Sequence, residues 1–413
     1  MSIDYSRVQT LTNMEKALKE NYLPVWRNGL TIEPSPLLGK IKKVKLTSNK
    51  IVTSAPIGLS GGFGYGAEGY ATPQAGPVPF ERFETYAKDM YVNIALSAKS
   101  VRLTGSGGSM ANALDTEVKA AYETAKWNVG RSLFGNGSGI LAYIEAVNNS
   151  NTFKLKTTYT EGGEEVTIPN AHRLLKEGLI IDVYADGAKY GDVPQASGSG
   201  LRIKSVDRVN NTVTVYGNAV TLTAGFITVQ NSYGREITGI GAIFDDGIDT
   251  LYGVKKSENK VIVPTTIHAE GDIDDSILWD AIDGASTYKN SQVDTILMGK
   301  SAYKHYIDYL RTNNVQVEIA TKDIVGGFKS LAYQFGNREI DIVYEQFIPD
   351  DETWCLDSKA LELHTQEWDF ADLQGGGIFN LMENSSVYRA LLANYGDLVC
   401  TNPGGCVRIT NCA

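Results

Sequence analysis

The chain has 413 residues, of which 42% are hydrophobic and 21% charged, and its formal net charge is −10. The length predicts two or three domains, and the composition is that of a globular chain. The acidic balance argues against a protein whose main task is coating nucleic acid, although one face can still meet DNA through local basic patches. No run of 18 apolar residues and no export leader occurs, so neither a membrane-spanning nor an exported protein is expected.

Four cysteines are present, Cys355, Cys400, Cys406 and Cys412. They are too few for a disulfide framework in a chain of this length. The spacing of the last three is not that of a zinc ribbon, and no histidine lies near them. We expect buried thiols with no metal-binding or crosslinking role.

Residues 1–46 are expected to form an N-terminal arm. One amphipathic helix is predicted over roughly residues 12–22, and Pro24, Pro34 and Pro36 then favour an extended, irregular segment. Residues 40–46 alternate lysines with apolar residues, which is typical of an edge strand guarded by charge. These lysines, which form either a solvated face or a basic surface, are Lys40, Lys42, Lys43 and Lys45.

Residues 47–100 contain two strand-like segments, 50–54 and 91–98, separated by a stretch rich in glycine, aromatic residues and proline. A structureless loop of this length is uncommon inside a compact domain. We therefore predict a long hairpin that leaves its own domain and lies on a neighbouring molecule. Residues 64–69 match G-x-G-x-x-G, but no buried strand precedes them and prolines prevent a following helix, so they are interpreted as a flexible tip.

Residues 110–134 are predicted to form a long helix. Apolar residues recur there every three or four positions, which places them on one stripe of the helix. Ser109 or Asn112 is a candidate cap, and Gly135, Gly137 and Gly139 end the helix. The stripe consists of Leu114, Val118, Tyr122, Ala125, Val129 and Leu133.

The rest of the chain changes character twice. Residues 143–234 alternate short apolar runs with turn signals, which predicts a small all-β module in which Asn210 and Asn211 turn one hairpin. Its expected core is Ile203, Val206, Val209, Val213 and Val215. Residues 235–345 alternate helices (274–286 and 301–311) with strands (294–298 and 341–344), and residues 346–413 return to strands.

Nothing in the sequence predicts catalysis. The four histidines are scattered, no nucleophile elbow occurs, and the acidic clusters fit helix starts and turns. We expect no catalytic, cofactor-binding or metal-binding residues.

Two segments resemble one known family. Residues 127–139, WNVGRSLFGNGSG, resemble the end of the spine helix in tailed-phage major capsid proteins of the Hong Kong 97 type, with Gly130 where that family often has asparagine. Residues 395–403, YGDLVCTNP, are similar to the family's C-terminal strand. The order of arm, hairpin and long helix also agrees with this family.

This resemblance implies an α+β fold of the Hong Kong 97 type. It has an N-terminal arm (1–46), an E-loop hairpin (47–100), a P domain (101–142 and 346–413, with the spine helix at 110–134), an inserted β module (143–234) and an A domain (235–345). The E-loop would contact neighbouring subunits through aromatic residues. These are Phe63, Tyr65, Tyr70 and Phe80.

The function implied by the resemblance is that of a phage major capsid protein. Such a chain assembles with itself into the pentamers and hexamers of an icosahedral head around double-stranded DNA, with the four lysines of residues 40–45 facing the DNA. The implied partners are a portal, a separate scaffolding protein and decoration proteins, and the implied location is the virion after assembly in the bacterial cytoplasm. Residues 58–79 contain no lysine, so the isopeptide crosslink of some family members is not expected.

Other functions remain open at this point. An encapsulin-type compartment shell has the same fold and differs by enclosing protein cargo. A multidomain enzyme or a ligand-binding protein would use the β module for its site. A tail protein is disfavoured, because the order of hairpin and spine helix is not expected there.

Overall fold

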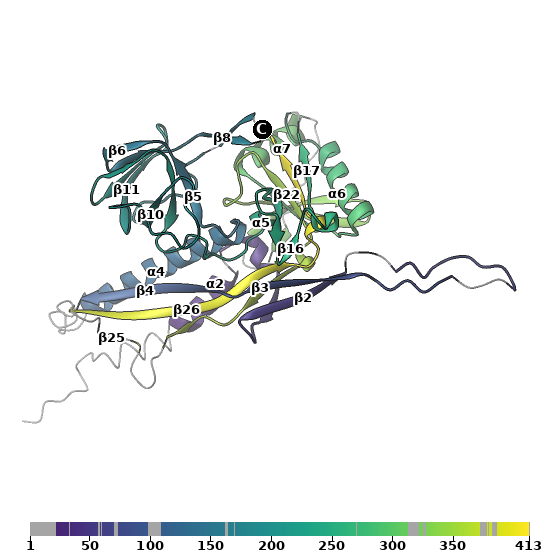
Figure 1. Cartoon of the computed structure of the whole chain (residues 1–413), viewed down its shortest axis with the longest axis horizontal. Helices are drawn as coiled ribbons and strands as arrows, with labels where there is room; N and C mark the ends of the chain where they lie inside the picture. The colour runs from purple at the N-terminus through teal and green to yellow at the C-terminus, as the bar shows by residue number, and fades with distance from the viewer. Residues whose placement is uncertain are drawn as a thin grey trace, which may run out of the picture.

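The computed structural model describes residues 22–32, 34–56, 58, 60–69, 73–97, 109–161, 164–168, 170–269, 271–312, 322–324, 328–371, 378, 380–381 and 386–412. These residues form a mixed α+β structure, as expected. Two long strands run the length of the body, the β module and an α/β domain lie on one side of them, and a narrow hairpin projects from one end (Figure 1).

The long helix is α4, which spans Ser109–Phe134 and confirms the predicted spine. Val118, Ala125 and Leu133 of its expected stripe are buried. The helix ends at Phe134, and Gly137 and Gly139 follow with φ values of 85° and 79°, a region that favours glycine.

The N-terminal segment differs from the expected extended arm. Residues Leu23–Ile32 form helix α2, which packs on α4 with the rings of Trp26 and Tyr122 5.5 Å apart. The extended prediction was wrong here because Pro24 lies in the first turn of α2, where its missing N–H has no intrahelical partner to lose. The short helix η3 (Pro36–Gly39) follows, and the predicted helix over 12–22 lies almost entirely outside the described residues.

Strand β26, Val387–Cys400, organises a six-stranded sheet. Strand β1 (Lys42–Lys45) lies at the edge of this sheet, as predicted, and pairs in parallel with β23 (Leu361–Thr365). The other partners of β26 are β4 (Lys88–Ser97), β24 (Asp369–Phe370) and β25 (Asn380–Leu381).

The projecting hairpin consists of β2 (Lys50–Pro56) and β3 (Phe80–Tyr86), which pair antiparallel from Lys50 opposite Tyr86 to Pro56 opposite Phe80. The hairpin is present, but the expected partner of residues 50–54 was wrong. Residues 91–97 belong to β4 and pair with β26. Both candidate segments have a strand-like pattern, which identifies a strand and not its partner.

The β module is built on a sheet of six strands in the order β5-β14-β10-β11-β12-β7. Ile203, Val213 and Val215 are buried as expected and Val206 packs against them, whereas Val209 is 89% exposed in the β11–β12 turn. Asn211 turns this hairpin with a φ of 50°. The strands are β5 (Ile140–Ile144), β7 (Thr152–Lys154), β10 (Ile180–Ala185), β11 (Leu201–Asp207), β12 (Thr212–Tyr216) and β14 (Gly225–Val229), with the small pairs β6 (Val147–Ser150) with β13 (Val220–Leu222) and β8 (Thr158–Glu161) with β9 (Glu164–Thr167).

The α/β domain has a seven-stranded sheet in the order β17-β27-β22-β18-β21-β20-β19. Helices α6 (Asp275–Lys289) and α7 (Lys300–Thr312) agree with the predicted helices, and Asp274 caps α6 by accepting the Ile277 N–H at 2.9 Å. The strands are β17 (Thr265–His268), β18 (Thr295–Met298), β19 (Lys322–Ile324), β20 (Phe328–Phe335), β21 (Arg338–Tyr344), β22 (Thr353–Leu356) and β27 (Val407–Thr410).

The expected boundary at residue 346 therefore needs correction. Strands β22 and β27 lie beyond it in sequence yet belong to the sheet of the α/β domain. The physical reason is that β22 completes the hydrogen bonding of β18, and β27 then pairs with both β22 and β17. The chain thus enters the α/β domain, leaves it for the long sheet, and returns through the short helix η6 (Pro403–Gly405).

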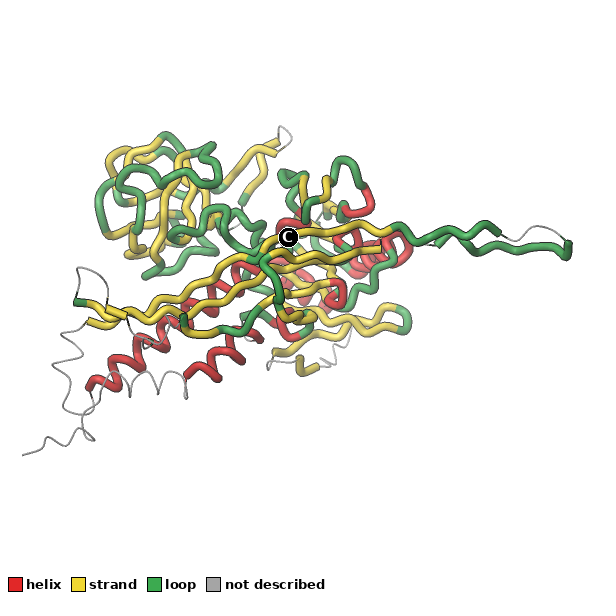
Figure 2. Tube along the Cα trace, turned by 60° about the horizontal axis from the view of Figure 1, so that its bottom comes forward, coloured by secondary structure: helices red, strands yellow, loops and turns green. Residues whose placement is uncertain are grey.

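The largest of three hydrophobic clusters joins the base of the hairpin to the spine helix and the β module. It runs from Phe83 at the base of the hairpin through Phe134 of α4 to Ile144 and Val213 of the β module. In Figure 2 the helices α4 and α2, in red, lie along one side of the long strands. The continuous core gives the projecting hairpin a firm base.

Candidate assembly interface

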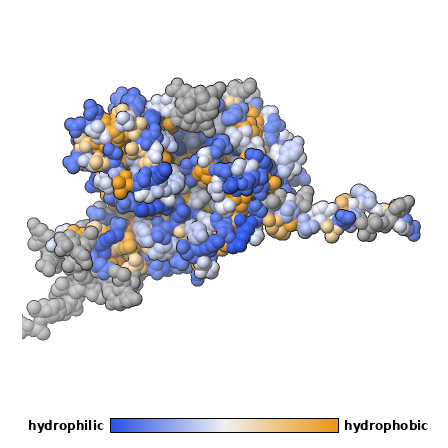
Figure 3. All heavy atoms as spheres, viewed as in Figure 1, coloured by the Kyte–Doolittle hydropathy of each residue, from blue (hydrophilic) through white to orange (hydrophobic). Residues whose placement is uncertain are grey.

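The hairpin beyond β2 and β3 projects far from the body (Figure 3), and most of its described residues are exposed. Phe63 and Tyr65 are 82% and 96% exposed, and their rings are 5.5 Å apart in an edge-to-face pair. Phe80, the first residue of β3, is 62% exposed, and Tyr70 lies outside the described residues. Large aromatic side chains on a thin projection expose apolar surface that only another molecule can cover.

The two sides of the tip run close together without regular strand pairing. The Ser60 hydroxyl donates to the Gly76 carbonyl at 2.6 Å. A Cβ atom added at Gly76 would lie 2.7 Å from the Gly61 backbone, so this close approach requires glycine. Residues 64–69 lie in this extended tip, and the described residues around them form no helix, so the G-x-G-x-x-G match has no dinucleotide-binding geometry.

A buried carboxylate, Asp397, anchors the base of the hairpin. It accepts the Thr85 hydroxyl of β3 at 2.5 Å and both the Thr238 N–H and hydroxyl at 2.6 and 3.1 Å. Burial raises the pKa of Asp397, while these hydrogen bonds act in the opposite direction. One side chain of β26 thus ties together the hairpin and the segment that follows the β module.

Tyr252 forms a second contact at the hairpin base. Its carbonyl accepts the Glu84 N–H at 2.8 Å, and its ring lies 5.7 Å from the ring of Phe83. Glu84 also pairs with Lys50 of β2 at 2.5 Å. Hydrogen bonds, ring packing and the strand ladder therefore fix the direction in which the hairpin leaves the body.

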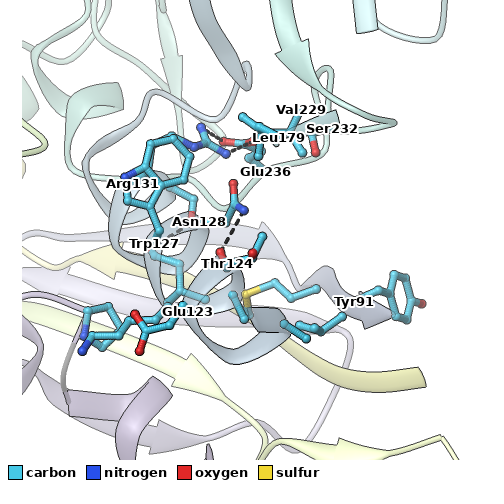
Figure 4. Close-up of a pocket in the computed structure, with 18 of the residues that line it drawn as sticks. Tyr91, Glu123, Thr124, Trp127, Asn128, Arg131, Leu179, Val229, Ser232 and Glu236 are labelled. Carbon is cyan, nitrogen blue, oxygen red and sulfur yellow. Dashed lines mark hydrogen bonds and ion pairs between the residues drawn. The ribbon is translucent and has the colours of Figure 1, made fainter. Parts of the chain in front are cut away.

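A groove of about 1870 Å³ separates α4 and β4 from the β module. Figure 4 shows Trp127, Asn128 and Arg131 of α4 facing residues of the module across it. Arg131 forms a buried bidentate ion pair with Glu236, with N–O distances of 2.9 and 2.5 Å. This pair links the spine to the segment that follows the β module.

The four lysines of the arm fall into two groups. Lys40 pairs with the buried Asp341 and donates to the Thr295 hydroxyl at 3.0 Å, and Lys42 pairs with Glu362 at 2.5 Å. Lys43 and Lys45 are exposed and make no ion pair with any residue that the structure describes. Partial burial lowers the pKa of Lys43. Lys42 is exposed as well, and it differs from Lys43 and Lys45 in having a carboxylate partner among the described residues.

The histidines lie at four separate places. His172, His268 and His305 contact Asn211, Thr410 and Asp272 respectively. His364 lies 3.4 Å from Glu362. Within the described ranges, no group of three histidine, cysteine, aspartate or glutamate side chains is arranged to hold a metal ion. In the same ranges, no helix combines the length and apolar character that crossing a membrane requires.

Sequence reasoning identified the hairpin tip but missed its anchors. Asp397 and Thr238 are 159 residues apart, and Glu236 lies 105 residues from Arg131. No local pattern marks such residues as partners. Their one signal is a charged residue within an otherwise apolar segment, as at Asp397 in β26.

No family model and no curated protein matches this sequence. Among solved structures, the chain is similar to the capsid asymmetric unit of cyanophage A-1(L), at 9% identity over 90% of each chain with a TM-score of 0.48. It is similar to the holo-SrpI encapsulin complex of Synechococcus elongatus PCC 7942, at 8% identity over 90% of this chain and 85% of the other, with a TM-score of 0.44. A third similar structure is the procapsid of satellite phage P4, at 10% identity over 97% and 95%, with a TM-score of 0.42.

Proposed function

We propose that this chain is the major capsid protein of a tailed bacteriophage and assembles into the pentamers and hexamers of an icosahedral head around double-stranded DNA. The observation that carries the proposal is the β2–β3 hairpin. Its tip projects from the body with Phe63 and Tyr65 almost fully exposed. The hairpin precedes the long helix α4, one stripe of which is buried. Aromatic anchors of this kind dominate the energy of protein interfaces.

The geometry suits repeated head-to-tail contacts between identical subunits. One copy would contribute the hairpin and the next copy would contribute its body, which is a heterologous contact that closes into rings when the rotation between copies allows it. Each copy would then make several modest contacts, and their number would stabilise the shell. The firm base of the hairpin at Asp397 and Tyr252 supports such a role, since a preorganised projection loses less entropy on binding.

The remaining partners belong to the same proposal. Lys43 and Lys45 would face the packaged DNA, whereas Lys40 and Lys42 already have carboxylate partners within the chain. A portal, a separate scaffolding protein and decoration proteins would join the shell, and the β module would lie on its outer face. Assembly would take place in the bacterial cytoplasm, and the finished protein would be part of the virion.

Negative-stain microscopy and size-exclusion chromatography test the proposal. The intact chain is compared with a variant in which residues 61–76 are replaced by a short glycine–serine turn. Shells, rings or tubes from the intact chain and free, folded subunits from the variant are expected. A monodisperse monomer for both the intact chain and the variant, under several salt conditions and with scaffolding protein supplied, would contradict the proposal.

The contents of the particles separate a phage head from a compartment shell. Particles that form in the host with the other head proteins should contain nuclease-protected double-stranded DNA. Particles that instead enclose a folded protein cargo and no DNA would favour an encapsulin-type shell.

A further inference from the structure

Two thiols meet where the chain passes from the long sheet to the α/β sheet. Cys400 is the last residue of β26, and Cys406 lies between η6 and β27. Their Sγ atoms are 4.0 Å apart, which is contact distance for two sulfur atoms, and both side chains are buried. A disulfide needs a sulfur–sulfur distance of about 2 Å, so the two sulfur atoms must move closer before they can bond.

The turn between the two cysteines is held in one conformation. The Thr401 N–H donates to the Ala360 carbonyl at 2.8 Å, and the Asn402 side-chain amide donates to the Lys289 carbonyl at 3.0 Å. A Cβ atom added at Gly404 would lie 1.9 Å from the Val261 carbonyl oxygen, so this position is packed against its neighbour. The scaffold therefore presents the two thiols to each other in a fixed arrangement.

The two cysteines lie where the hairpin base, the long sheet and the α/β sheet come together. The Cys400 N–H donates to the Tyr252 hydroxyl at 3.3 Å, and Tyr252 also packs on Phe83 at the hairpin base. Cys406 leads directly into β27, which pairs with β17 and β22. A bond between the two sulfur atoms would close a small ring of chain where the hairpin base and both sheets meet.

We propose that Cys400 and Cys406 are a disulfide-forming pair, oxidised by a low-molecular-weight disulfide such as oxidised glutathione. One cysteine thiolate attacks a sulfur of the small disulfide and releases one small thiol, which leaves a mixed disulfide on the protein. The second cysteine then attacks the protein sulfur of that mixed disulfide and releases the other small thiol. The two protein thiols lose two electrons and two protons, and the small disulfide is reduced to two thiols.

Burial determines when this bond can form. The contact with Cys400, together with burial, raises the pKa of the Cys406 thiol, which lowers its thiolate fraction and slows its attack. The bond should therefore form while the turn is open, during folding or slow local opening, and not by rapid reaction of the folded chain. If the proposed function holds, the pair would stay reduced in the cytoplasm and would be able to close after release to an oxidising exterior.

The test is a thiol count on the full chain after refolding. The reduced protein is unfolded in guanidinium chloride and refolded with either oxidised glutathione or a reducing agent, and the remaining thiols are blocked with N-ethylmaleimide in denaturant. Intact mass should show four blocked thiols in the reduced sample and two in the oxidised sample. The tryptic peptide over residues 390–408, which contains both cysteines, should be lighter by two hydrogens and should carry no blocking group.

Two double variants complete the design. Oxidation should disappear in Cys400→Ala/Cys406→Ala and persist in the matched control Cys355→Ala/Cys412→Ala, which removes the other two buried thiols. The oxidised wild type should melt several degrees above the reduced form, and a reducing agent should reverse the shift, because a disulfide restricts the unfolded chain.

The peptide map is read on the wild type, so it decides the question even if the first variant does not fold. Four free thiols after oxidative refolding, stable glutathione adducts alone, or a bond between other cysteines would overturn the proposal. These readouts do not require shells to form, so a failed disulfide and a failed capsid assignment are distinguishable.

Discussion

Asp397 is a buried carboxylate that accepts hydrogen bonds from two separate segments and from the N–H of the adjacent Leu398. It accepts from Thr85 and Thr238, and the described surroundings supply no cationic side chain in direct contact with it. Replacing it with asparagine puts an amide donor among groups that are themselves donors. We expect Asp397→Asn to lower the free energy of unfolding by about 2–3 kcal/mol, the loss typical of buried donors left unsatisfied.

Guanidinium unfolding of the purified subunit checks this expectation. Asp308→Asn, on the exposed surface of α7, is the matched control and should leave the transition almost unchanged. A transition for Asp397→Asn that coincides with the control would show that this carboxylate does not hold the hairpin base.

Glu345 gives the subunit a pH dependence near neutrality. Its carboxyl accepts the Ser35 hydroxyl at 2.7 Å, and burial raises its pKa from the ordinary value of 4.5 to about 7. Arg173 lowers this pKa, while burial also raises the pKa values of the nearby Asp351 and Glu352. Between pH 4.5 and about pH 7, Glu345 is more protonated in the folded chain than in the unfolded chain. The free energy of unfolding therefore falls as the pH rises through this range.

The free energy of unfolding should therefore decrease between about pH 5 and pH 8, and the Glu345 contribution should amount to at most roughly 3 kcal/mol. Urea unfolding at several pH values measures this slope. Glu345→Gln keeps the shape of the side chain without its ionisation, so its slope should be shallower. An equal slope in wild type and variant would assign the pH dependence to other groups.

An internal ion pair joins helix α4 to the segment that follows the β module. The side chains of Arg131 and Glu236 are 4% and 9% exposed. Replacing Arg131 alone with methionine leaves Glu236 buried without its partner, which should destabilise the subunit by about 3–5 kcal/mol. The double variant Arg131→Met/Glu236→Gln removes the unpaired charge, so we expect it to be more stable than the single variant.

Chemical denaturation of the two variants measures this coupling. The exposed pair of Lys255 and Glu258 offers the control, and Lys255→Met should have a negligible effect. The single variant Glu236→Gln completes the comparison. If the stability losses of the two single variants simply added up to that of the double variant, the ion pair would not couple the two residues.

The elements that the sequence predicts well are those with a strong local pattern. Helix α4 was predicted from its apolar stripe and from the glycines that follow it. Residues 294–298 were predicted to be a buried strand, and β18 is that strand. Pairing is different, because period-two alternation marks a strand without naming its partner. Residues 91–97 therefore looked like the second strand of the hairpin although they pair with β26.

The same limit applies to the candidate interface. Glycines, prolines and aromatic residues in 58–84 are enough to predict a projecting tip, since a structureless loop of this length is uncommon inside a compact domain. Its anchors are not predictable in this way, because Asp397, Thr238 and Tyr252 meet the hairpin only through the folded chain. Val209 shows the converse, since this apolar residue, expected in the core of the β module, proved to be exposed at a turn between Arg208 and Asn210.

The shape of the whole subunit separates stability from assembly. The continuous core from Phe83 to Val213 holds the body together, whereas the hairpin tip contributes nothing to that core. Changes at the tip should therefore leave folding intact and act on contacts between copies alone. An assembly surface differs from an ordinary exposed loop in that its substitution weakens the contacts between copies while stability stays the same.

The double variant Phe63→Ser/Tyr65→Ser tests this separation. Because both side chains are more than 80% exposed, the subunit should unfold at the same denaturant concentration as the wild type. Interface anchors each contribute about 2 kcal/mol or more, so the protein concentration needed for assembly should rise at least about tenfold. Light scattering against concentration measures this threshold, and Val209→Ser, which removes an equally exposed side chain from the β module, should leave it unchanged. Equal thresholds for the wild type and the tip variant would mean that the hairpin does not hold subunits together, since the substitution removes the largest apolar groups that the described part of the tip offers to a neighbour.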